Sequence, residues 1–260
     1  MRRVQAPHSF HILRTLGQGR EGTVYKARKD GREYVVKMFS DLSGSEADLE
    51  AYAQRVRGKE GGLLPVSLIY DGARLAGLYY NYVPLFHVPA VAYRRSQILH
   101  RALLSQYCHT QAFLMKQHAM EMVDGAQFLL AEDGYFFFVD YGSCIVRADN
   151  DWCRTRGYAV FSFLRALFEP VGIVLDADVR QPGFDYSRPC EFVQPAQYEA
   201  LRRRSPWTAP IVERIRQSEA RVFLDPDLYA WIAGLNVRVV PHAKWLVAPD
   251  KLRRAIAGTL

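Results

Sequence analysis

Hydrophobic and polar residues alternate over much of the first 83 positions, which is the pattern of half-buried strands. The pattern is clearest around Asp30-Gly31 and Asp71-Gly72, where Asp-Gly pairs separate apolar stretches and indicate tight hairpins. The strands predicted in this way are "FHILRTL", "TVYKARK", "EYVVKMF", "LPVSLIYDG" and "RLAGLYYNYVP". Between the third and fourth lies "SGSEADLEAYAQRVRG", with serine caps, good helix formers and a closing Gly58, which predicts a helix of about three turns.

The pattern changes after Pro84 and Pro89. Residues 93–118 are predicted to form one long helix or two short ones. From Gly157, "GYAVFSFLRALF" is apolar on nearly every side, as in a buried helix. Between these segments, "AQFLLAEDGYFFFVDYG" predicts a short hairpin turning at Asp133-Gly134. Further helices are expected at 195–204, 208–219, 226–234 and 249–258.

These elements predict an α+β fold in two lobes joined at a hinge marked by the two prolines. Residues 1–83 would form a small antiparallel β lobe with one helix. Residues 84–260 would form a larger, mainly helical lobe.

Composition fits a folded chain, since 49% of the 260 residues are hydrophobic and a sizeable core is available. The net charge of +7 suits an anionic partner such as a nucleotide, an acidic protein, a phosphoglycan or a membrane surface, and is equally that of a basic soluble protein.

No run approaches the ~18 apolar residues of a spanning helix. The N-terminal "MRRVQAPHSF" lacks the apolar segment of a Sec signal, so we expect a cytoplasmic protein. The alternative is export by a pathway that does not use a Sec signal. The four cysteines form no metal-ligand spacing, and we expect them to be reduced thiols.

A glycine motif stands between the first two predicted strands. Gly17, Gly19, Gly22 and Val24 complete the pattern G-x-G-x-x-G-x-V in "GQGREGTV". Glycines allow backbone N–H groups to approach anionic oxygens closely. In dinucleotide-binding folds such a motif opens a helix, whereas β-branched and aromatic residues follow it here, which favours a strand–turn–strand. The motif therefore predicts a phosphate cradle, the alternative being a glycine-rich hairpin with no ligand.

Lys37 lies fifteen residues after Gly22, within the apolar strand "YVVKMF". A lysine in such a strand often extends to solvent. Beside a glycine-rich hairpin, its ammonium would instead neutralise phosphate charge.

Residues 13–83 resemble the small lobe of the protein-kinase superfamily, through "LGQGREGTVYKA" and "YVVK". The resemblance implies that Lys37 holds the α and β phosphates of ATP and pairs with a glutamate on the next helix, Glu50 or, in reserve, Glu46. "LYYNYVP" resembles the segment that joins the lobes. Backbone groups at Asn81, Tyr82 and Val83 would then face adenine.

"FFFVDYGS" resembles the strand that ends in the metal-binding Asp-Phe-Gly, with Tyr141 in place of phenylalanine. Asp140 would then chelate Mg²⁺ that bridges the phosphates, the alternative being an ordinary turn aspartate.

The catalytic loop departs from the family pattern H-R-D-L-x-x-x-N. In "HAMEMVDGAQFLL", Gln127 occupies the position of the metal-binding asparagine, and Met122 the position of the catalytic aspartate. Glu121 and Asp124 are nearby acids that would serve as base through a re-routed loop, or are ordinary loop carboxylates. His118 is either a proton acceptor or a helix-end histidine.

Only fourteen residues separate Gly142 from Gly157, which leaves little room for an activation loop. A segment as short as this one resembles those of bacterial minimal kinases and of the sugar or lipopolysaccharide kinases of the superfamily. The resemblance implies an atypical ATP-dependent phosphotransferase that acts on a hydroxyl of a protein, small molecule or glycan with Mg²⁺. The alternative is a pseudokinase that binds nucleotide or a partner protein without catalysis. We expect no nucleic-acid partner.

Overall fold

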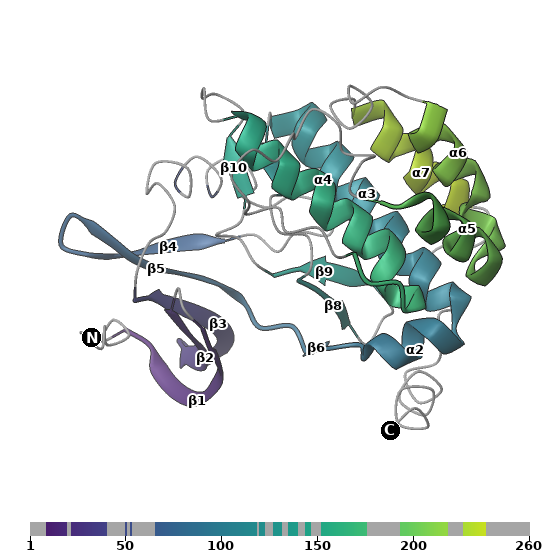
Figure 1. Cartoon of the computed structure of the whole chain (residues 1–260). Coiled ribbons are helices and arrows are strands. Elements are labelled where there is room, and N and C mark those ends of the chain that lie inside the picture. The colour runs from purple at the N-terminus through teal and green to yellow at the C-terminus, as the bar shows by residue number, and fades with distance from the viewer. Residues whose placement is uncertain are drawn as a thin grey trace.

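The computed structural model describes residues 9–19, 22–40, 50, 53, 66–118, 120–122, 127–131, 135–139, 144–146, 152–175, 193–217 and 226–237. Within these residues the fold is α+β, as predicted. Figure 1 shows strands β1 to β5 on one side of the molecule and most of the helices on the other. The strand β5 and the short β6 lead from the strand-rich part into the helical part.

The strand-rich part is a five-stranded antiparallel sheet in the order β1-β2-β3-β5-β4. Its strands are β1 (His11–Gln18), β2 (Gly22–Lys29), β3 (Arg32–Phe39), β4 (Ser67–Asp71) and β5 (Arg74–Asn81). Asp30 and Gly31, with φ of 49° and 75°, form the two-residue turn between β2 and β3. Two successive left-handed residues suit the twist of a hairpin, which is why Asp-Gly is favoured there. Gly72, with φ of 61°, opens the turn between β4 and β5.

The two faces of this sheet pack against different clusters. On β3, Val35 and Phe39 belong to the main core, whereas Val36 and Met38 point to the opposite face. That opposite face is covered by the rings of Phe10, Tyr34 and Tyr79. Their centroids lie 5.0 to 5.8 Å apart in edge-to-face contacts. The alternation of β3 therefore leaves one face of the sheet for the helical part.

The helix predicted at 43–58 is described at two residues, Glu50 and Ala53, and both are helical. Ala53 is buried in the main core. The remainder of the predicted helix, including Glu46, lies outside the described residues.

The helical part carries the other elements. They are β6 (Leu85–Phe86), α2 (Ala90–Arg95), α3 (Gln97–His118), β7 (Met120–Met122), β8 (Phe128–Ala131), β9 (Phe136–Phe138), β10 (Cys144–Val146), α4 (Trp152–Phe168), η2 (Glu169–Val171), α5 (Pro195–Arg204), η4 (Pro206–Thr208), α6 (Ala209–Gln217) and α7 (Pro226–Val237). Two small antiparallel sheets are formed, β6-β8-β9 and β10-β7. The predicted turn at Asp133-Gly134 and the helix predicted at 249–258 lie outside the described residues.

The segment predicted as one long helix or two short ones divides at Ser96. The Ser96 N–H ends α2 by donating to the Ala92 carbonyl at 2.9 Å. The Ser96 hydroxyl oxygen lies 3.4 Å from the Leu99 N–H, the position of a serine cap at the start of α3. Helix α4 begins at Trp152, five residues before the expected Gly157.

Helix α3 runs through the centre of the helical part. Leu104, Tyr107 and Leu114 of this helix are fully buried, as are Phe163 and Leu167 of α4. Among the described residues, no helix combines the length and the apolar character needed to cross a membrane. Cys108, also on α3, is a free thiol whose pKa is raised by burial, as expected of a reduced cysteine.

His100 gives the fold a pH dependence that can be measured. Its ring is fully buried, its Nε2 lies 3.2 Å from the Ala166 carbonyl, and burial lowers its pKa from 6.5 to about 4. Above pH 6.5 the imidazole is neutral in both states. Below pH 6.5 the His100 imidazole is protonated in the unfolded chain but stays neutral in the folded chain. The free energy of unfolding therefore falls as the pH is lowered to about 4, by about 3 kcal/mol in total.

Urea unfolding of the wild type and of His100→Gln at pH 7 and pH 4.5 tests this. We expect the wild type to lose more free energy of unfolding than the variant between the two pH values. Equal losses in both proteins would contradict the assignment to His100.

Candidate functional site

A cavity of about 700 Å³ lies between the strand-rich sheet and the start of the helical part. Its walls come from β1, β2, β3, β5, the linker after β5, and the β8–β9 hairpin. The residues that line it are Arg14, Leu16, Gly17, Gln18, Gly19, Gly22, Val24, Val35, Lys37, Tyr80, Tyr82, Val83, Leu85, His87, Gln127, Leu129 and Val139. Segments more than a hundred residues apart in the sequence therefore share one wall.

The three glycines of the motif all line this cavity, but they differ in what surrounds them. A Cβ at Gly22 would lie 2.0 Å from the carbonyl oxygen of Met38, so the packing of β2 on β3 excludes any side chain there. A Cβ at Gly17 or Gly19 would meet nothing within 4 Å, and neither residue has a left-handed φ. The packing of β2 against β3 thus accounts for the glycine at position 22. Gly17 and Gly19 line the cavity, and neither packing nor backbone conformation requires a glycine at these two positions.

Lys37 reaches the same cavity from β3. Its Cα lies opposite Val24 on β2 and Leu78 on β5, in the middle of the sheet. The side chain is half-buried, and its Nζ lies 5.7 Å from the centroid of the Phe39 ring. The strand alternation that puts Val35 in the cavity wall puts Lys37 there as well, two residues along.

The linker is bound to the β2–β3 hairpin. Tyr82 donates its backbone N–H to the Glu33 carbonyl at 3.1 Å, and the Lys26 Nζ lies 4.0 Å above the Tyr82 ring. The Lys26 ammonium also pairs with the Glu33 carboxylate at 2.8 Å, and this contact lowers the pKa of that carboxyl. Of the three linker residues predicted to face a base, Tyr82 and Val83 line the cavity, whereas Asn81 ends β5 and is not part of the described wall.

The β8–β9 hairpin supplies the far side of the cavity. Val139 donates its backbone N–H to the Gln127 carbonyl at 3.1 Å, so the two residues continue the pairing of Phe128 with Phe138. Both Gln127 and Val139 line the cavity, and Val139 directly precedes Asp140 in the chain. Asp140 and Asp124 themselves lie outside the described residues.

Within the predicted catalytic loop, the structure describes residues 120–122 as the strand β7. Met122 pairs with Cys144, and Glu121 with Ile145, in the β7–β10 ladder. The Met122 N–H donates to the Gln111 side-chain oxygen at 2.9 Å, and the Met122 side chain is fully buried in the main core. Glu121 is 3% exposed. Of the residues that the structure describes, neither of these two lines the cavity.

Glu50, predicted to pair with Lys37, accepts a hydrogen bond from the Tyr70 hydroxyl of β4 at 2.5 Å. Its pairing with Lys37 stays a prediction.

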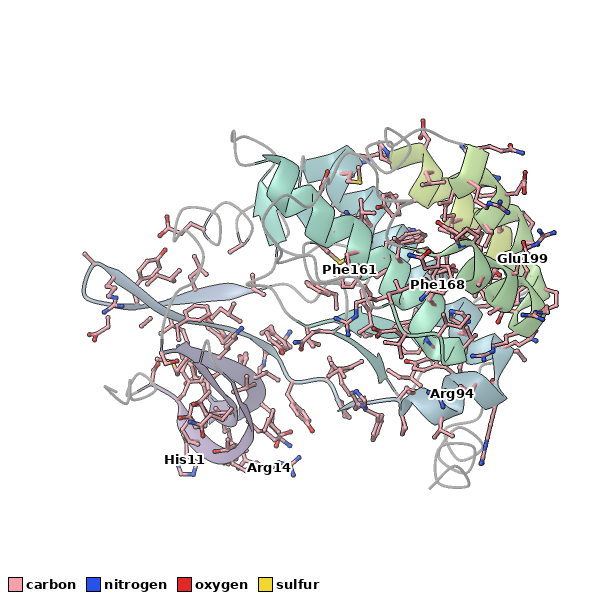
Figure 2. The ribbon with its side chains drawn as sticks, in the orientation of Figure 1. His11, Arg14, Arg94, Phe161, Phe168 and Glu199 are labelled. Carbon is pink, nitrogen blue, oxygen red and sulfur yellow. The ribbon has the colours of Figure 1, made fainter. Side chains whose placement is uncertain are left out.

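The described wall carries positive charge. Arg14 and Lys37 are cations, His87 is a further basic group, and no aspartate or glutamate occurs in the part of the wall that the structure describes. Arg14, labelled in Figure 2, lies on β1 at the edge of the strand-rich part. Such a wall favours an anionic ligand.

Several residues that line the cavity were not predicted. Alternation along β3 would have found Val35, which lies two residues before Lys37 on the same face, whereas irregular pairing between β1 and β2 hides the lining residues of β1 from such a pattern. Nothing local indicated His87, Leu129 or Val139, because their place depends on how the helical part packs below the sheet.

The described residues of this wall would provide only part of the ligands that a magnesium ion needs. No group of three or more His, Cys, Asp or Glu suited to a metal occurs in the described part of the chain. Gln127 contributes one amide oxygen at the cavity, and oxygen is the donor that Mg²⁺ prefers.

Comparison with known proteins assigns no family: no family model matches the chain, and no curated protein matches it.

Proposed function

We propose that the chain is an atypical ATP-dependent phosphotransferase with a protein-kinase-like fold. The cavity would bind a nucleoside triphosphate, whose γ-phosphate passes to a hydroxyl of a protein, a small molecule or a glycan.

The observation that carries this proposal is the contrast among the three glycines. Gly22 is required by its contact with Met38, whereas Gly17 and Gly19 have no such neighbour and face the cavity. A triphosphate accounts for them, because phosphate oxygens bind backbone N–H groups best where no side chain intervenes.

The rest of the wall suits the other parts of a nucleotide. Leu16, Val24 and Leu129 provide apolar surface for a base, and Leu16 is 41% exposed. Val83 of the linker also lines the cavity. Lys37, deeper in the sheet, would neutralise phosphate charge.

Gln127 and Asp140 are the residues that would hold Mg²⁺, together with phosphate oxygens. The ion would supply neutralisation of the charge that develops on the phosphates. For this chain's own residues the chemistry consists of binding and alignment, on which phosphoryl transfer depends strongly. A base would come from Asp124, or from Glu121 through a rearrangement of the β7–β10 ladder, since Glu121 is buried and does not line the cavity in this structure.

Lys37→Ala is expected to weaken binding of Mg-ATP about 30-fold, since a charge-assisted contact to phosphate contributes about 2 kcal/mol. Isothermal titration calorimetry with Mg-ATP measures this directly. Lys29→Ala is the matched control, because Lys29 lies on the same sheet next to the Asp30-Gly31 turn and does not line the cavity. Equal dissociation constants for the wild type and Lys37→Ala would contradict the role of Lys37.

A second candidate, a pseudokinase that binds nucleotide and regulates a partner, is favoured by Met122. The residue at the base position is buried in the core rather than exposed in the cavity. General-base assistance contributes about 10² to 10⁴ in rate, so its loss would leave a slow enzyme or none.

Transfer of radiolabelled phosphate from ATP separates the two candidates. For a phosphotransferase, Asp140→Ala is expected to abolish transfer, and Asp124→Asn or Glu121→Gln to slow it. ATP binding without any transfer by the wild type, over several acceptor classes, would favour the pseudokinase.

A further inference from the structure

A second cavity, of about 180 Å³, adjoins the first at His87, which lines both. It lies where the chain leaves the linker and enters α2, against the last turns of α4 and η2. The other residues that line it are Val88, Ala90, Tyr93, Leu103, Phe128, Ser162, Arg165, Ala166, Glu169 and Pro170.

The inner wall of this second cavity is apolar, aromatic and well supported. Tyr93, Leu103 and Phe128 are each at most 9% exposed. The Tyr93 ring stacks on Phe136 with centroids 6.4 Å apart, and the Phe128 ring contacts Phe138 at 5.5 Å. Rings held by neighbours on their other sides form a surface that a planar ligand can contact without reordering it.

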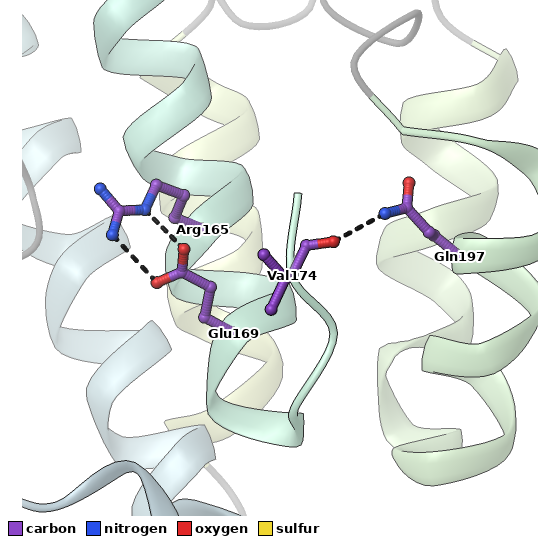
Figure 3. A network of polar contacts seen from close by, with 4 residues as sticks. All are labelled: Arg165, Glu169, Val174 and Gln197. Atoms are coloured by element: carbon purple, nitrogen blue, oxygen red, sulfur yellow. Dashed lines mark hydrogen bonds and ion pairs between the residues drawn. The ribbon is translucent and has the colours of Figure 1, made fainter. Parts of the chain in front are cut away.

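The rim is polar but carries little net charge. Arg165 binds Glu169 through two parallel hydrogen bonds, from Nε at 2.7 Å and from Nη2 at 3.2 Å (Figure 3). Beyond η2, the Gln197 side chain donates to the Val174 carbonyl at 2.8 Å and ties that segment to α5. Because the Arg165 and Glu169 charges neutralise each other, this pair gives the rim no excess charge to attract an ionic ligand, whereas its polar atoms suit a neutral ligand with a hydroxyl group.

The volume of about 180 Å³ suits a ligand with a single ring. An apolar cavity of about 150 Å³ is sufficient for benzene. We propose that this second cavity is a binding site for a neutral, single-ring molecule that carries a hydroxyl group. The ring would contact Tyr93 and Phe128, and the hydroxyl would face the rim.

His87 couples this site to the first cavity. Because the residue His87 lines both cavities, a ligand in one cavity would restrict the positions that His87 can take toward the other. Coupling between two sites is reciprocal, so each ligand changes the affinity of the other by the same factor. The coupling between the two cavities rests on the proposed nucleotide site, whereas the single-ring site does not.

Phenol is the probe for the site. In a titration followed by ¹H–¹³C NMR of the full chain, we expect saturable binding with a dissociation constant of about 1 mM, and contacts between phenol ring protons and the Leu103 methyl groups. Ala90→Trp, which places an indole at the exposed mouth, is expected to raise that constant tenfold or more, while Ala73→Trp, in the distant β4–β5 turn, leaves it unchanged. No saturable binding, or contacts only elsewhere on the wild type, would overturn the site even if Ala90→Trp fails to fold.

The coupling is tested by the dissociation constant for ATP with and without saturating phenol. We expect a change of about fivefold in the wild type and no change in His87→Ala. An unchanged constant in the wild type would overturn the coupling. Phenol binding without any ATP binding would instead refute the proposed function and leave the single-ring site standing.

Discussion

Replacing Met122 with aspartate is expected to lower the free energy of unfolding by about 5 kcal/mol, and not to produce a faster phosphotransferase. The wild-type side chain is fully buried in the main core, and its backbone N–H is bound to the Gln111 side chain. A carboxylate there would lose its hydration inside a cluster of apolar side chains. Urea unfolding and phosphate transfer, measured on the same preparation, give the two quantities.

Met122→Leu is the matched control, because a swap of similar volume in a core costs less than about 1.5 kcal/mol. A stable Met122→Asp protein with an increased rate of transfer would mean that this side chain faces the nucleotide. The strand assignment of β7 would then be wrong for the active protein.

Gly22→Ala is expected to lower the free energy of unfolding by about 4 kcal/mol, at the upper end for added volume in a packed site. Its new methyl group would lie 2.0 Å from the Met38 carbonyl oxygen, and backbone on both sides would have to move. Gly17→Ala and Gly19→Ala are the controls within the same motif. They have open space for a methyl group and are expected to change stability by less than about 1 kcal/mol.

The same three variants also test the role of the cavity. Gly17→Ala and Gly19→Ala are expected to weaken ATP binding while they unfold at nearly the wild-type urea concentration. Two stable variants that bind ATP as tightly as the wild type would mean that no ligand approaches the backbone at these glycines.

Local chemistry predicted much of the fold. Asp30-Gly31 forms its turn because both residues tolerate left-handed φ, and alternation along "YVVKMF" placed Val35 and Lys37 on one face of β3. The helices α5 and α7 begin at the expected residues, Pro195 and Pro226, because proline suits the first turn of a helix.

Other features depend on contacts distant in sequence and could not be predicted locally. Glu121 was expected in a loop, but its segment pairs with β10 to form a ladder. The contact of Lys26 with the Tyr82 ring depends on the linker returning to the β2–β3 hairpin. His87 has a place in two cavities only because α2 and α4 pack beside the linker.

The most direct test is a crystal structure with magnesium and a non-hydrolysable ATP analogue. We expect the analogue's base to lie against Leu16 and Leu129, with phosphate oxygens about 3 Å from the Lys37 Nζ and from a backbone N–H of the glycine hairpin. An analogue bound outside this cavity, or with its phosphates directed away from both Lys37 and Gly19, would contradict it.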